Sequence, residues 1–281
     1  MSSDDIKPRG WPESYAADAQ PRMGFFTDTS LCIGCKACEV ACKEWNQLPL
    51  DDFGFKGESY DNTGALGADT WRHVAFIEQQ RPVQAEDGEG MRWLMSSDVC
   101  KHCTTAPCLD VCPTGALFRT EFGTVVVQDD VCNGCGMCVP ACPFGVIERR
   151  EDDGRAWKCT LCYDRLKDGM EPACAKACPT DSIQFGPLDE LRVHASGRLE
   201  EVRAAGEPDA RLYLEDPGDG VHGGGAFFLL LDEPEVYGLP PDPVAPTHRL
   251  GTIWGAVGGA AAAIALGVAA ATLGAERRGR R

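Results

Sequence analysis

Sixteen cysteines constrain this chain more than any other feature, because they fall into four groups with short, repeated spacings. The groups are Cys32, Cys35, Cys38, Cys42; Cys100, Cys103, Cys108, Cys112; Cys132, Cys135, Cys138, Cys142; and Cys159, Cys162, Cys174, Cys178. Every group opens with CxxC, and the last three place a proline directly after their final cysteine. Such a repeat predicts a chain that folds around four similar inorganic centres rather than around one large apolar core.

Three kinds of cysteine chemistry compete for these groups. Disulfides fit poorly, because CxxC pairs repeated in register give strained tight loops rather than bridges between distant segments. Zinc is the stronger alternative, since two cysteine pairs make the usual four-thiolate site, but such a site does not need a third cysteine on the same loop. In CxxCxxCxxxC, three thiolates bind one [4Fe-4S] cluster and the fourth ligates the other cluster of a two-cluster ferredoxin.

Residues 112–138 look like the middle of a bacterial two-cluster ferredoxin, with a short β excursion expected between two cluster loops. All four groups have a complete set of cysteines, and no histidine replaces any of them. We therefore expect four fully ligated [4Fe-4S] clusters. The proline after the final cysteine fixes φ and has no N–H, so the backbone can turn away at that point.

Composition and motifs exclude several functions. The 281 residues carry a formal net charge of -16, which would repel a phosphate backbone, so we expect protein partners and no nucleic acid. Residues 1–24 form a polar, acidic, proline-interrupted extension that does not have the pattern of a signal peptide. Since fully ligated clusters leave no open coordination site, and no nucleophile with a base or nucleotide-binding loop stands out, we expect an electron carrier without catalytic residues.

The histidines and the cluster-loop glycines have simpler expected roles. His102 lies inside the second cysteine group, where we expect it to donate a hydrogen bond near sulfur rather than to bind iron. Surface or core positions are expected for His73, His194, His222 and His248. Gly34, Gly134 and Gly136 are expected to adopt positive φ and to let backbone amides approach the sulfurs.

The rest of the sequence predicts an α+β fold of tandem two-cluster ferredoxin-like modules with loop or hairpin insertions, plus one C-terminal transmembrane helix. Residues 71–79 and 91–99 should form a hairpin, residues 187–206 an amphipathic helix, and residues 226–234 a short buried strand. Residues 236–246 are a proline-rich linker. The expected divisions are a polar extension at 1–24, the first group with its insertion at 25–99, an inner two-cluster module at 100–150, the fourth group at 151–186, a helix and strand segment with its linker at 187–249, the membrane helix at 250–274 and a basic tail at 275–281.

The membrane helix is predicted from charge and length. Residues 252–273 have no charged side chain, and as a helix they would extend about 33 Å, enough to cross a hydrocarbon core. Small residues recur every four positions along one face, at Gly251, Gly255, Gly259, Ala263 and Gly267. Such a stripe lets a partner helix approach closely, although an alanine-rich helix without a partner has the same pattern.

The orientation of this span follows from its flanking charges. Arg249 precedes it, and Arg277, Arg278, Arg280 and Arg281 follow it. The positive-inside rule then places the C-terminus in the cytoplasm and the cluster region on the outer side of the membrane. The opposite orientation stays open, because alanine-rich spans orient weakly.

Three stretches carry a resemblance to a known family: DTSLCIGCKACEVACKEWNQLP, KCTLCYDRLKDGMEPACAKACPT and VYGLPPDP before the single span. From about residue 25 onward, the chain resembles the iron-sulfur β subunit of membrane-bound respiratory formate dehydrogenase, among the four-cluster subunits of dimethyl-sulfoxide-reductase-type molybdenum or tungsten enzymes. The resemblance implies a heterotrimer, in which a molybdopterin-containing catalytic α subunit oxidises formate and a cytochrome b γ subunit passes the relayed electrons to quinone. It also implies export of the folded chain with a partner that carries a twin-arginine signal.

The resemblance further implies a nested pairing of the cysteine groups. Cluster 1 is Cys32, Cys35, Cys38 and Cys178; cluster 2 is Cys100, Cys103, Cys108 and Cys142; cluster 3 is Cys132, Cys135, Cys138 and Cys112; and cluster 4 is Cys159, Cys162, Cys174 and Cys42. Spacing alone leaves open a pairing of the third group with the fourth. The nested version gives the inner pair a ferredoxin-like spacer, residues 113–131, and leaves the insertion at 43–99 free to dock on the catalytic subunit.

Two other functions stay open at this point. The same relay could serve another catalytic partner, such as a nitrate, thiosulfate or polysulfide reductase or a hydrogenase. A zinc-stapled, membrane-tethered assembly protein would have the same number of thiolates.

Overall fold

The structure is a computed structural model, and it describes residues 21–50, 57, 63–80 and 90–279, without the side chains of 248–250 and 272–279. Most of the polar extension predicted at 1–24 lies outside the described residues, as does the tip of the predicted hairpin at 81–89. The chain divides into two compact units, Met1–Val244 and Ala245–Arg281, and each is described by itself.

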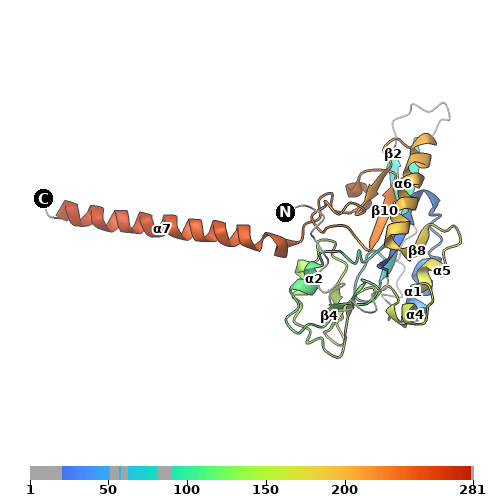
Figure 1. Ribbon diagram of the computed structural model, residues 1–281, viewed down its shortest axis with the longest axis horizontal. Helices are drawn as coiled ribbons and strands as arrows, with labels where there is room; N and C mark the ends of the chain where they lie inside the picture. The colour runs from blue at the N-terminus through green and yellow to red at the C-terminus, as the bar shows by residue number, and fades with distance from the viewer. Residues whose placement is uncertain (1–20, 51–56, 58–62, 81–89, 280–281) are drawn as a thin grey trace. The chain divides into compact units, whose positions relative to one another are not determined.

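A sheet with the strand order β8-β1-β10-β9 forms the apolar centre of the first unit, as far as the described residues extend. Its strands are β1 (Met23–Asp28), β8 (Ile183–Pro187), β9 (Arg211–Tyr213) and β10 (Ala226–Leu230). Strand β10 lies in the middle and is buried at every residue, which explains its unbroken apolar sequence and confirms the predicted buried strand. Helix α6 (Leu188–Ala204), which the sequence also predicts, packs on β1 and β8 (Figure 1).

The pairing of β1 with β8 closes the cysteine-rich region. Strand β1 ends shortly before the first cysteine group, and β8 begins shortly after the last one, so every cysteine lies between these two strands in the sequence. The two strands are antiparallel, with Thr27 opposite Ile183. The first group therefore follows β1, and the fourth precedes β8, at the same end of these two strands.

Short helices contain or flank the cysteine groups, and two-stranded ribbons lie between the groups. The helices are α1 (Ala37–Asn46), α2 (Pro107–Asp110), α3 (Cys138–Ala141), α4 (Tyr163–Lys167) and α5 (Ala173–Lys176). The ribbons are β4 (Leu117–Arg119) with β5 (Val125–Val127), and β6 (Glu148–Arg149) with β7 (Ala156–Trp157). The β4–β5 ribbon lies between the second and third groups, where the sequence predicts a short β excursion.

The insertion after the first group contains the predicted hairpin. Strands β2 (Arg72–Gln80) and β3 (Met91–Val99) pair antiparallel, from Arg72 opposite Val99 to Gln80 opposite Met91. The first residues of β2 are buried, whereas its other end is partly exposed. The base of the hairpin is therefore buried, and it lies beside cysteines, since Ser97 contacts Cys38 and Arg72 contacts Cys174.

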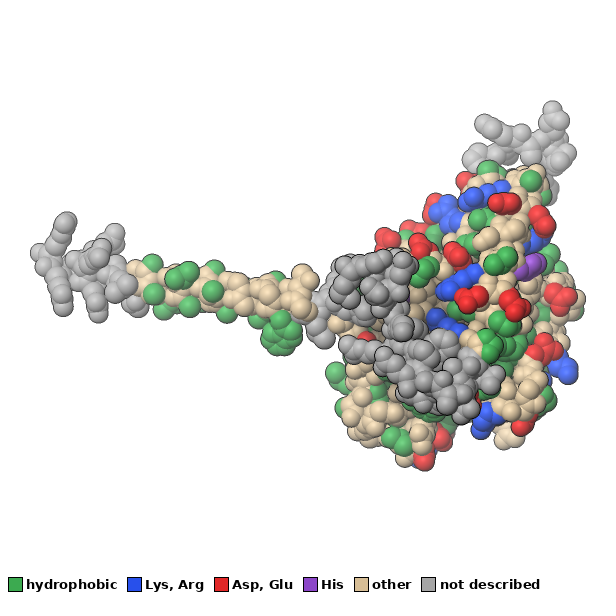
Figure 2. Space-filling view, viewed as in Figure 1, with side chains coloured by type: hydrophobic (Ala, Val, Ile, Leu, Met, Phe, Trp, Pro, Cys, Tyr) green, Lys and Arg blue, Asp and Glu red, His purple; other side chains and the backbone are tan. Residues whose placement is uncertain are grey.

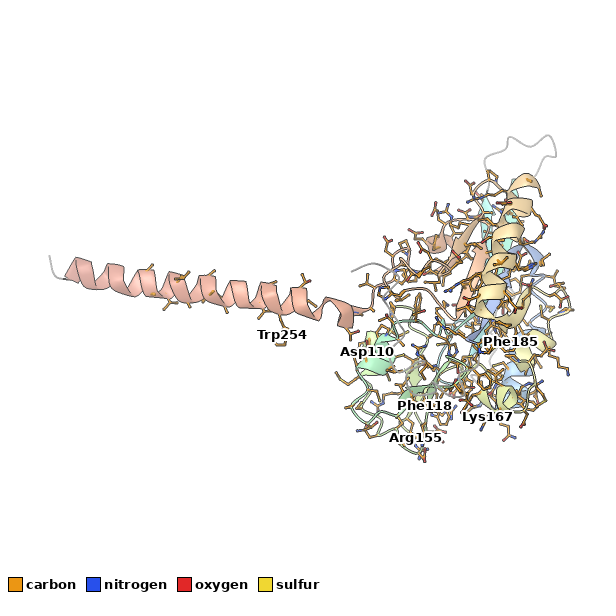
Figure 3. The ribbon with its side chains drawn as sticks, in the orientation of Figure 1. Asp110, Phe118, Arg155, Lys167, Phe185 and Trp254 are labelled. Atoms are coloured by element: carbon orange, nitrogen blue, oxygen red, sulfur yellow. The ribbon has the colours of Figure 1, made fainter. Side chains whose placement is uncertain are left out.

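The second unit consists of a 3-10 turn, Pro246–Arg249, and helix α7 (Leu250–Gly279). Within α7, Gly251–Ala271 has a mean hydropathy of 1.8 and no buried residue, so its length and composition suit a membrane span. Figure 2 shows no charged side chain on the described part of this helix. Trp254 projects from it (Figure 3) and is 69% exposed, as expected of an aromatic side chain near a membrane interface.

Candidate metal centres

The sixteen cysteines are all free thiols, which excludes the disulfide alternative. The four groups share one backbone feature: the second residue after the first cysteine has positive φ. These residues are Gly34 (66°), His102 (42°), Gly134 (70°) and Leu161 (58°). A left-handed residue at this position turns the following amides toward the sulfurs, and Leu161 shows the result, because its N–H donates to Cys159 Sγ at 3.3 Å. Glycine, histidine and leucine in one left-handed conformation indicate loops built for the same ligand.

Glycine is needed at two of these positions for a second reason. A Cβ on Gly34 would lie 2.6 Å from the ring of Phe76, and one on Gly134 would lie 2.5 Å from the carbonyl oxygen of Gly154. The N–H of Gly34 also contacts the Cys32 thiol. These contacts agree with the predicted roles of both glycines, and Gly136 likewise has positive φ (74°).

Each cysteine group lies beside cysteines from another group. Cys32 is within electrostatic range of Cys178, and Cys103 is within range of Cys142. Cys138 has Cys112 as a neighbour. Around Cys42 lie Cys159, Cys162 and Cys174. These are the neighbours that the nested pairing requires, and the sets are called sites 1 to 4 below, numbered as clusters 1 to 4 above.

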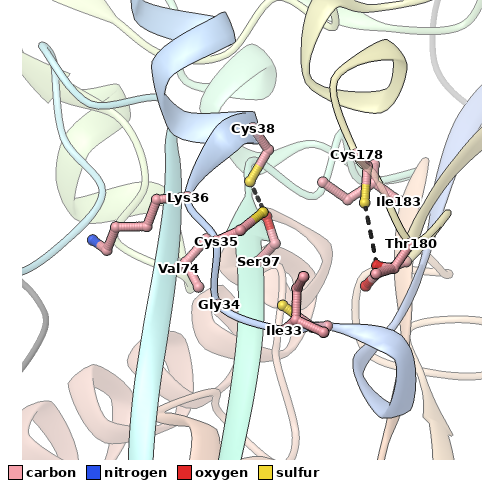
Figure 4. Close-up of a pocket in the computed structure, with 12 residues that line it drawn as sticks. Ile33, Gly34, Cys35, Lys36, Cys38, Val74, Ser97, Cys178, Thr180 and Ile183 are labelled. Atoms are coloured by element: carbon pink, nitrogen blue, oxygen red, sulfur yellow. Dashed lines mark hydrogen bonds between the residues drawn. The ribbon is translucent and has the colours of Figure 1, made fainter.

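A cavity lies at site 1. All four cysteines of the site line it: Cys32, Cys35, Cys38 and Cys178. Figure 4 shows that its wall is completed from the hairpin by Val74 and Ser97, and from the segment before β8 by Thr180. Thr180 Oγ1 lies 3.8 Å from Cys178 Sγ. The cavity thus has four thiols, with the hydroxyls of Ser97 and Thr180 and the apolar side chains of Ile33, Val74 and Ile183 around them, a lining that fits an iron-sulfur cluster.

Hydrogen bonds from the protein point at sulfur in the other sites as well. Asn46 Nδ2 donates to Cys42 Sγ at 3.6 Å, and the amide of Ala156 donates to Cys132 Sγ at 3.5 Å. Such donors stabilise the added negative charge of a reduced cluster and so tune its potential.

Zinc and an iron-sulfur cluster need different arrangements of four sulfurs. A tetrahedral zinc site needs all four sulfurs about 2.3 Å from a single ion, whereas a cubane places one thiolate at each of four separated corners. Burial raises the pKa of the Cys38 thiol to about 11, and that of Cys108 to about 12, so a bound metal has to supply the positive charge that keeps these ligands ionised.

Cationic side chains are buried among the sites, although the chain as a whole is strongly acidic. Arg72, Lys101 and Lys158 are at most 2% exposed. Lys158 Nζ donates to the carbonyl oxygens of Val125 and Cys159. Lys101 pairs with Asp98. Because buried charges are normally compensated, Arg72 and Lys158 suit an anionic group such as a thiolate-ligated cluster. Sequence reasoning missed them, since an isolated Arg or Lys in a sequence has the pattern of a surface residue.

His102 has the form expected of a hydrogen-bond donor near sulfur. Its Nδ1 accepts the N–H of Val125 at 3.1 Å, so the proton of the neutral ring is on Nε2. Burial, followed by the charges of Lys158 and Arg119, lowers the pKa of His102 well below its usual range and keeps the ring neutral. Nε2 is buried and has no hydrogen-bond partner within the described part of the chain. It is therefore a donor that a cluster sulfur can satisfy.

Comparison with known proteins agrees with this chemistry. Models described as "4Fe-4S dicluster domain" match residues 31–116 and residues 91–188. The chain is 39% identical to the formate dehydrogenase iron-sulfur subunit of Haemophilus influenzae over 260 residues, which are 91% of this chain and 80% of that protein. It is 40% identical to the formate dehydrogenase-O iron-sulfur subunit of Escherichia coli over 236 residues, 83% of this chain and 75% of that protein.

The chain belongs to the family of formate dehydrogenase iron-sulfur subunits. It also has a relative in another enzyme: the B subunit of the anaerobic dimethyl sulfoxide reductase of Escherichia coli is 38% identical over 171 residues, 61% of this chain and 76% of that protein. As a formate dehydrogenase-type iron-sulfur subunit with sixteen cysteines in two dicluster domains, the chain holds four [4Fe-4S] clusters and transfers electrons. Each bound cluster would supply one-electron chemistry at its own four cysteines.

Proposed function

We propose that this chain carries electrons from a formate-oxidising molybdopterin subunit to a membrane cytochrome b and quinone, through clusters bound at the nested cysteine sites. The observation that carries the proposal is that each site has a cysteine near a cysteine of the next site. Cys38 of site 1 neighbours Cys174 of site 4, Cys159 of site 4 neighbours Cys100 of site 2, and Cys108 of site 2 neighbours Cys138 of site 3. These neighbours support a single line of sites in the order 1, 4, 2, 3.

Exposure at the two ends of this line supports its use as a relay. Cys35 in site 1 and Cys135 in site 3 are exposed, whereas Cys159 in site 4 and Cys103 in site 2 are buried. Ile33 and Met137, which lie in the same two loops as the exposed cysteines, are 59% and 54% exposed. Sites 1 and 3 are therefore the places where a donor and an acceptor can approach.

The membrane helix supports a membrane acceptor. The apolar span of α7 is long enough to cross a bilayer, and its small-residue stripe suits a helix of the cytochrome b subunit. The arginines after the span favour a cytoplasmic C-terminus and a cluster region on the outer side.

This orientation is tested by cysteine labelling in intact cells. Asp242 is exposed and lies shortly before the span, so the thiol of Asp242→Cys should react with a membrane-impermeant maleimide added from outside. The control is the unaltered chain, which reports any reaction of its own sixteen cysteines. Protection of Asp242→Cys in intact cells, with labelling only after lysis, would contradict the outer location.

The exposed end of the hairpin, around Met91 and Trp93, is the proposed docking surface for the catalytic subunit. Met91 and Trp93 are 62% and 43% exposed there. Replacing residues 78–91 by a short turn, with the buried base of the hairpin kept, should prevent assembly with the catalytic subunit but leave the iron content unchanged. Assembly at the normal level would contradict this role.

The relay itself is tested with Cys35→Ser in the complete complex. Formate-dependent quinone reduction should be lost, while formate oxidation with a viologen acceptor on the catalytic subunit is retained. If both activities survive unchanged, the relay proposal is wrong. Metal analysis of the anaerobically purified chain gives an independent check, because a colourless protein with bound zinc would contradict the cluster assignment.

A dimethyl sulfoxide reductase-type partner is the second candidate. The 38% identity to the B subunit of such an enzyme favours it, but that match covers 61% of this chain, against 91% for the Haemophilus influenzae formate dehydrogenase subunit. The identity of the large subunit that co-purifies with the chain separates the two.

A further inference from the structure

Two residues of the hairpin base join cysteines from two different sites. Arg72 is the first residue of β2, and Ser97 lies in β3. Each is only 1% exposed. Neither belongs to a cysteine group, and the function proposed above assigns neither of them a role.

Their hydrogen bonds form a continuous connection from site 1 to site 4. Ser97 Oγ lies 3.2 Å from Cys38 Sγ of site 1. Arg72 Nη1 donates to the carbonyl oxygen of Ser97 at 3.1 Å and lies 3.5 Å from its Oγ. Arg72 Nη2 donates to Cys174 Sγ of site 4 at 3.4 Å. One guanidinium therefore contacts a site 4 sulfur directly and a site 1 sulfur through a single hydroxyl.

The surroundings of Arg72 hold its guanidinium in place, and an arginine side chain keeps its positive charge in proteins. The guanidinium carbon lies 4.8 Å from the ring centroid of Phe25 in β1, a cation–π contact. Nε is buried and has no hydrogen-bond partner within the described ranges. A fixed cation with a spare donor thus lies between two sites that bind anionic clusters.

We propose that Arg72, oriented by Ser97, is a positioning residue shared by sites 1 and 4, which raises the reduction potentials of both clusters together and provides the hydrogen-bonded connection between them. The inference rests on the cysteine assignments of the proposed function. The physical reason is that an added electron makes a cluster more negative, so a nearby buried cation favours the reduced form. Because the same cation serves both sites, the two potentials rise together, and transfer between them does not become steeply uphill.

Replacing Arg72 and replacing Ser97 should have different effects on the two sites. Removing the charge of Arg72 should lower the potentials at sites 1 and 4. Removing the Ser97 hydroxyl should act mainly on site 1, since Cys38 is the cysteine that contacts it and the shorter bond of Arg72, to the Ser97 carbonyl oxygen, is kept. Sites 2 and 3 then serve as internal references. This pattern distinguishes a direct effect on two clusters from a general loosening of the fold, which would change the reduction potentials of all four clusters.

The test is an anaerobic redox titration of the full-length chain with mediators, followed by EPR. Signals are assigned with Cys35→Ser for site 1 and Cys162→Ser for site 4. The variants are Arg72→Gln, Arg72→Lys and Ser97→Ala. Two matched controls come from the same hairpin. Ser96→Ala changes the neighbour of Ser97, whose side chain points to the opposite face of β3. Arg92→Gln removes a guanidinium that pairs with Glu207 at 2.6 Å. Iron content is measured for every variant.

In Arg72→Gln, the equilibrium constants for reduction at sites 1 and 4 should each fall at least tenfold, which is about 59 mV for a one-electron couple. Arg72→Lys should lower them less, because it keeps the charge but loses the fork that reaches both partners. If Arg72→Gln loses iron, the proposal is tested instead by the potentials of sites 1 and 4 in Arg72→Lys and Ser97→Ala. Unchanged potentials at sites 1 and 4 in iron-replete variants, or an equal fall at all four sites, would overturn the proposal. The titration uses neither formate nor a partner subunit, so its failure is distinguishable from failure of the proposed function.

Discussion

Asp28 and Ser182 tie together the two ends of the cysteine-rich region. The amide of Asp28 donates to the carbonyl oxygen of Ser182 at 2.8 Å, and the Ser182 hydroxyl donates to the carbonyl oxygen of Asp28 at 2.7 Å. Both residues are buried, and they extend the β1–β8 pairing by one step toward the cysteines. This short connection gives a physical reason for Cys32 and Cys178 to lie in one cavity.

Ser182→Ala should weaken this connection. A buried hydrogen bond is worth about 1 kcal/mol, and the carbonyl of Asp28 would lose one partner. The visible absorption of the clusters should therefore disappear at a lower guanidinium concentration than in the unaltered chain. Ser196→Ala is the control, because Ser196 makes a comparable bond, to the Arg192 carbonyl at 3.0 Å, on the exposed side of α6. Equal midpoints for the two variants would argue against a structural role for Ser182.

Cys142→Ser separates the nested pairing from a pairing of the third group with the fourth. In the nested arrangement, Cys142 completes site 2 with Cys100, Cys103 and Cys108. Cys142→Ser and Cys100→Ser should then change or remove the same EPR signal. If Cys142→Ser instead gives the spectrum of Cys159→Ser, the nested assignment is wrong.

His102→Leu should lower the potential of the cluster at site 2. It removes the buried Nε2–H donor, and a hydrogen bond to a charged group is worth about 1.5–3 kcal/mol, so we expect the potential to fall by up to about 100 mV. Leucine is a suitable replacement because Leu161 already has positive φ at the same place in the fourth group. His102→Gln keeps a hydrogen-bond donor, so it should lower the potential of this cluster less. Identical potentials in all three proteins, measured by redox titration, would remove His102 from the set of tuning residues.

A chain ended after Val244 should keep its iron but lose its own membrane association. The first compact unit ends there, and the apolar helix α7 belongs to the second. In cells that lack the other subunits, the full chain should remain with the membrane after a high-salt wash, whereas the shortened chain should be released. Retention of the shortened chain would show that another surface binds the membrane.

Sequence patterns predict the cluster chemistry and several elements, because local spacing determines both. The hairpin at 72–99, helix α6, strand β10 and the apolar helix follow from periodicity and composition, and the structure contains all of them. The four-cluster content follows from the cysteine count, and the family matches bear it out. The nested pairing stays a prediction that the neighbouring thiols support.

The sequence does not predict the residues that act across long separations. Arg72 and Cys174 are 102 positions apart, and only the packing of the hairpin base against α5 brings them together. The same holds for the positive φ of His102 and Leu161. A glycine in a sequence can indicate a left-handed conformation, but a histidine or a leucine does not. These positions are held by tertiary contacts, and no local pattern records those contacts.

The β1–β8 connection also implies an order of biogenesis. Under the nested pairing, sites 2 and 3 are complete as soon as the ribosome has synthesised Cys142, whereas site 4 must wait for Cys174 and site 1 for Cys178. Ser182 and β8 follow only after that. Under this pairing, the ligands of the inner two clusters are therefore complete before those of the outer two, so the inner clusters can be inserted first.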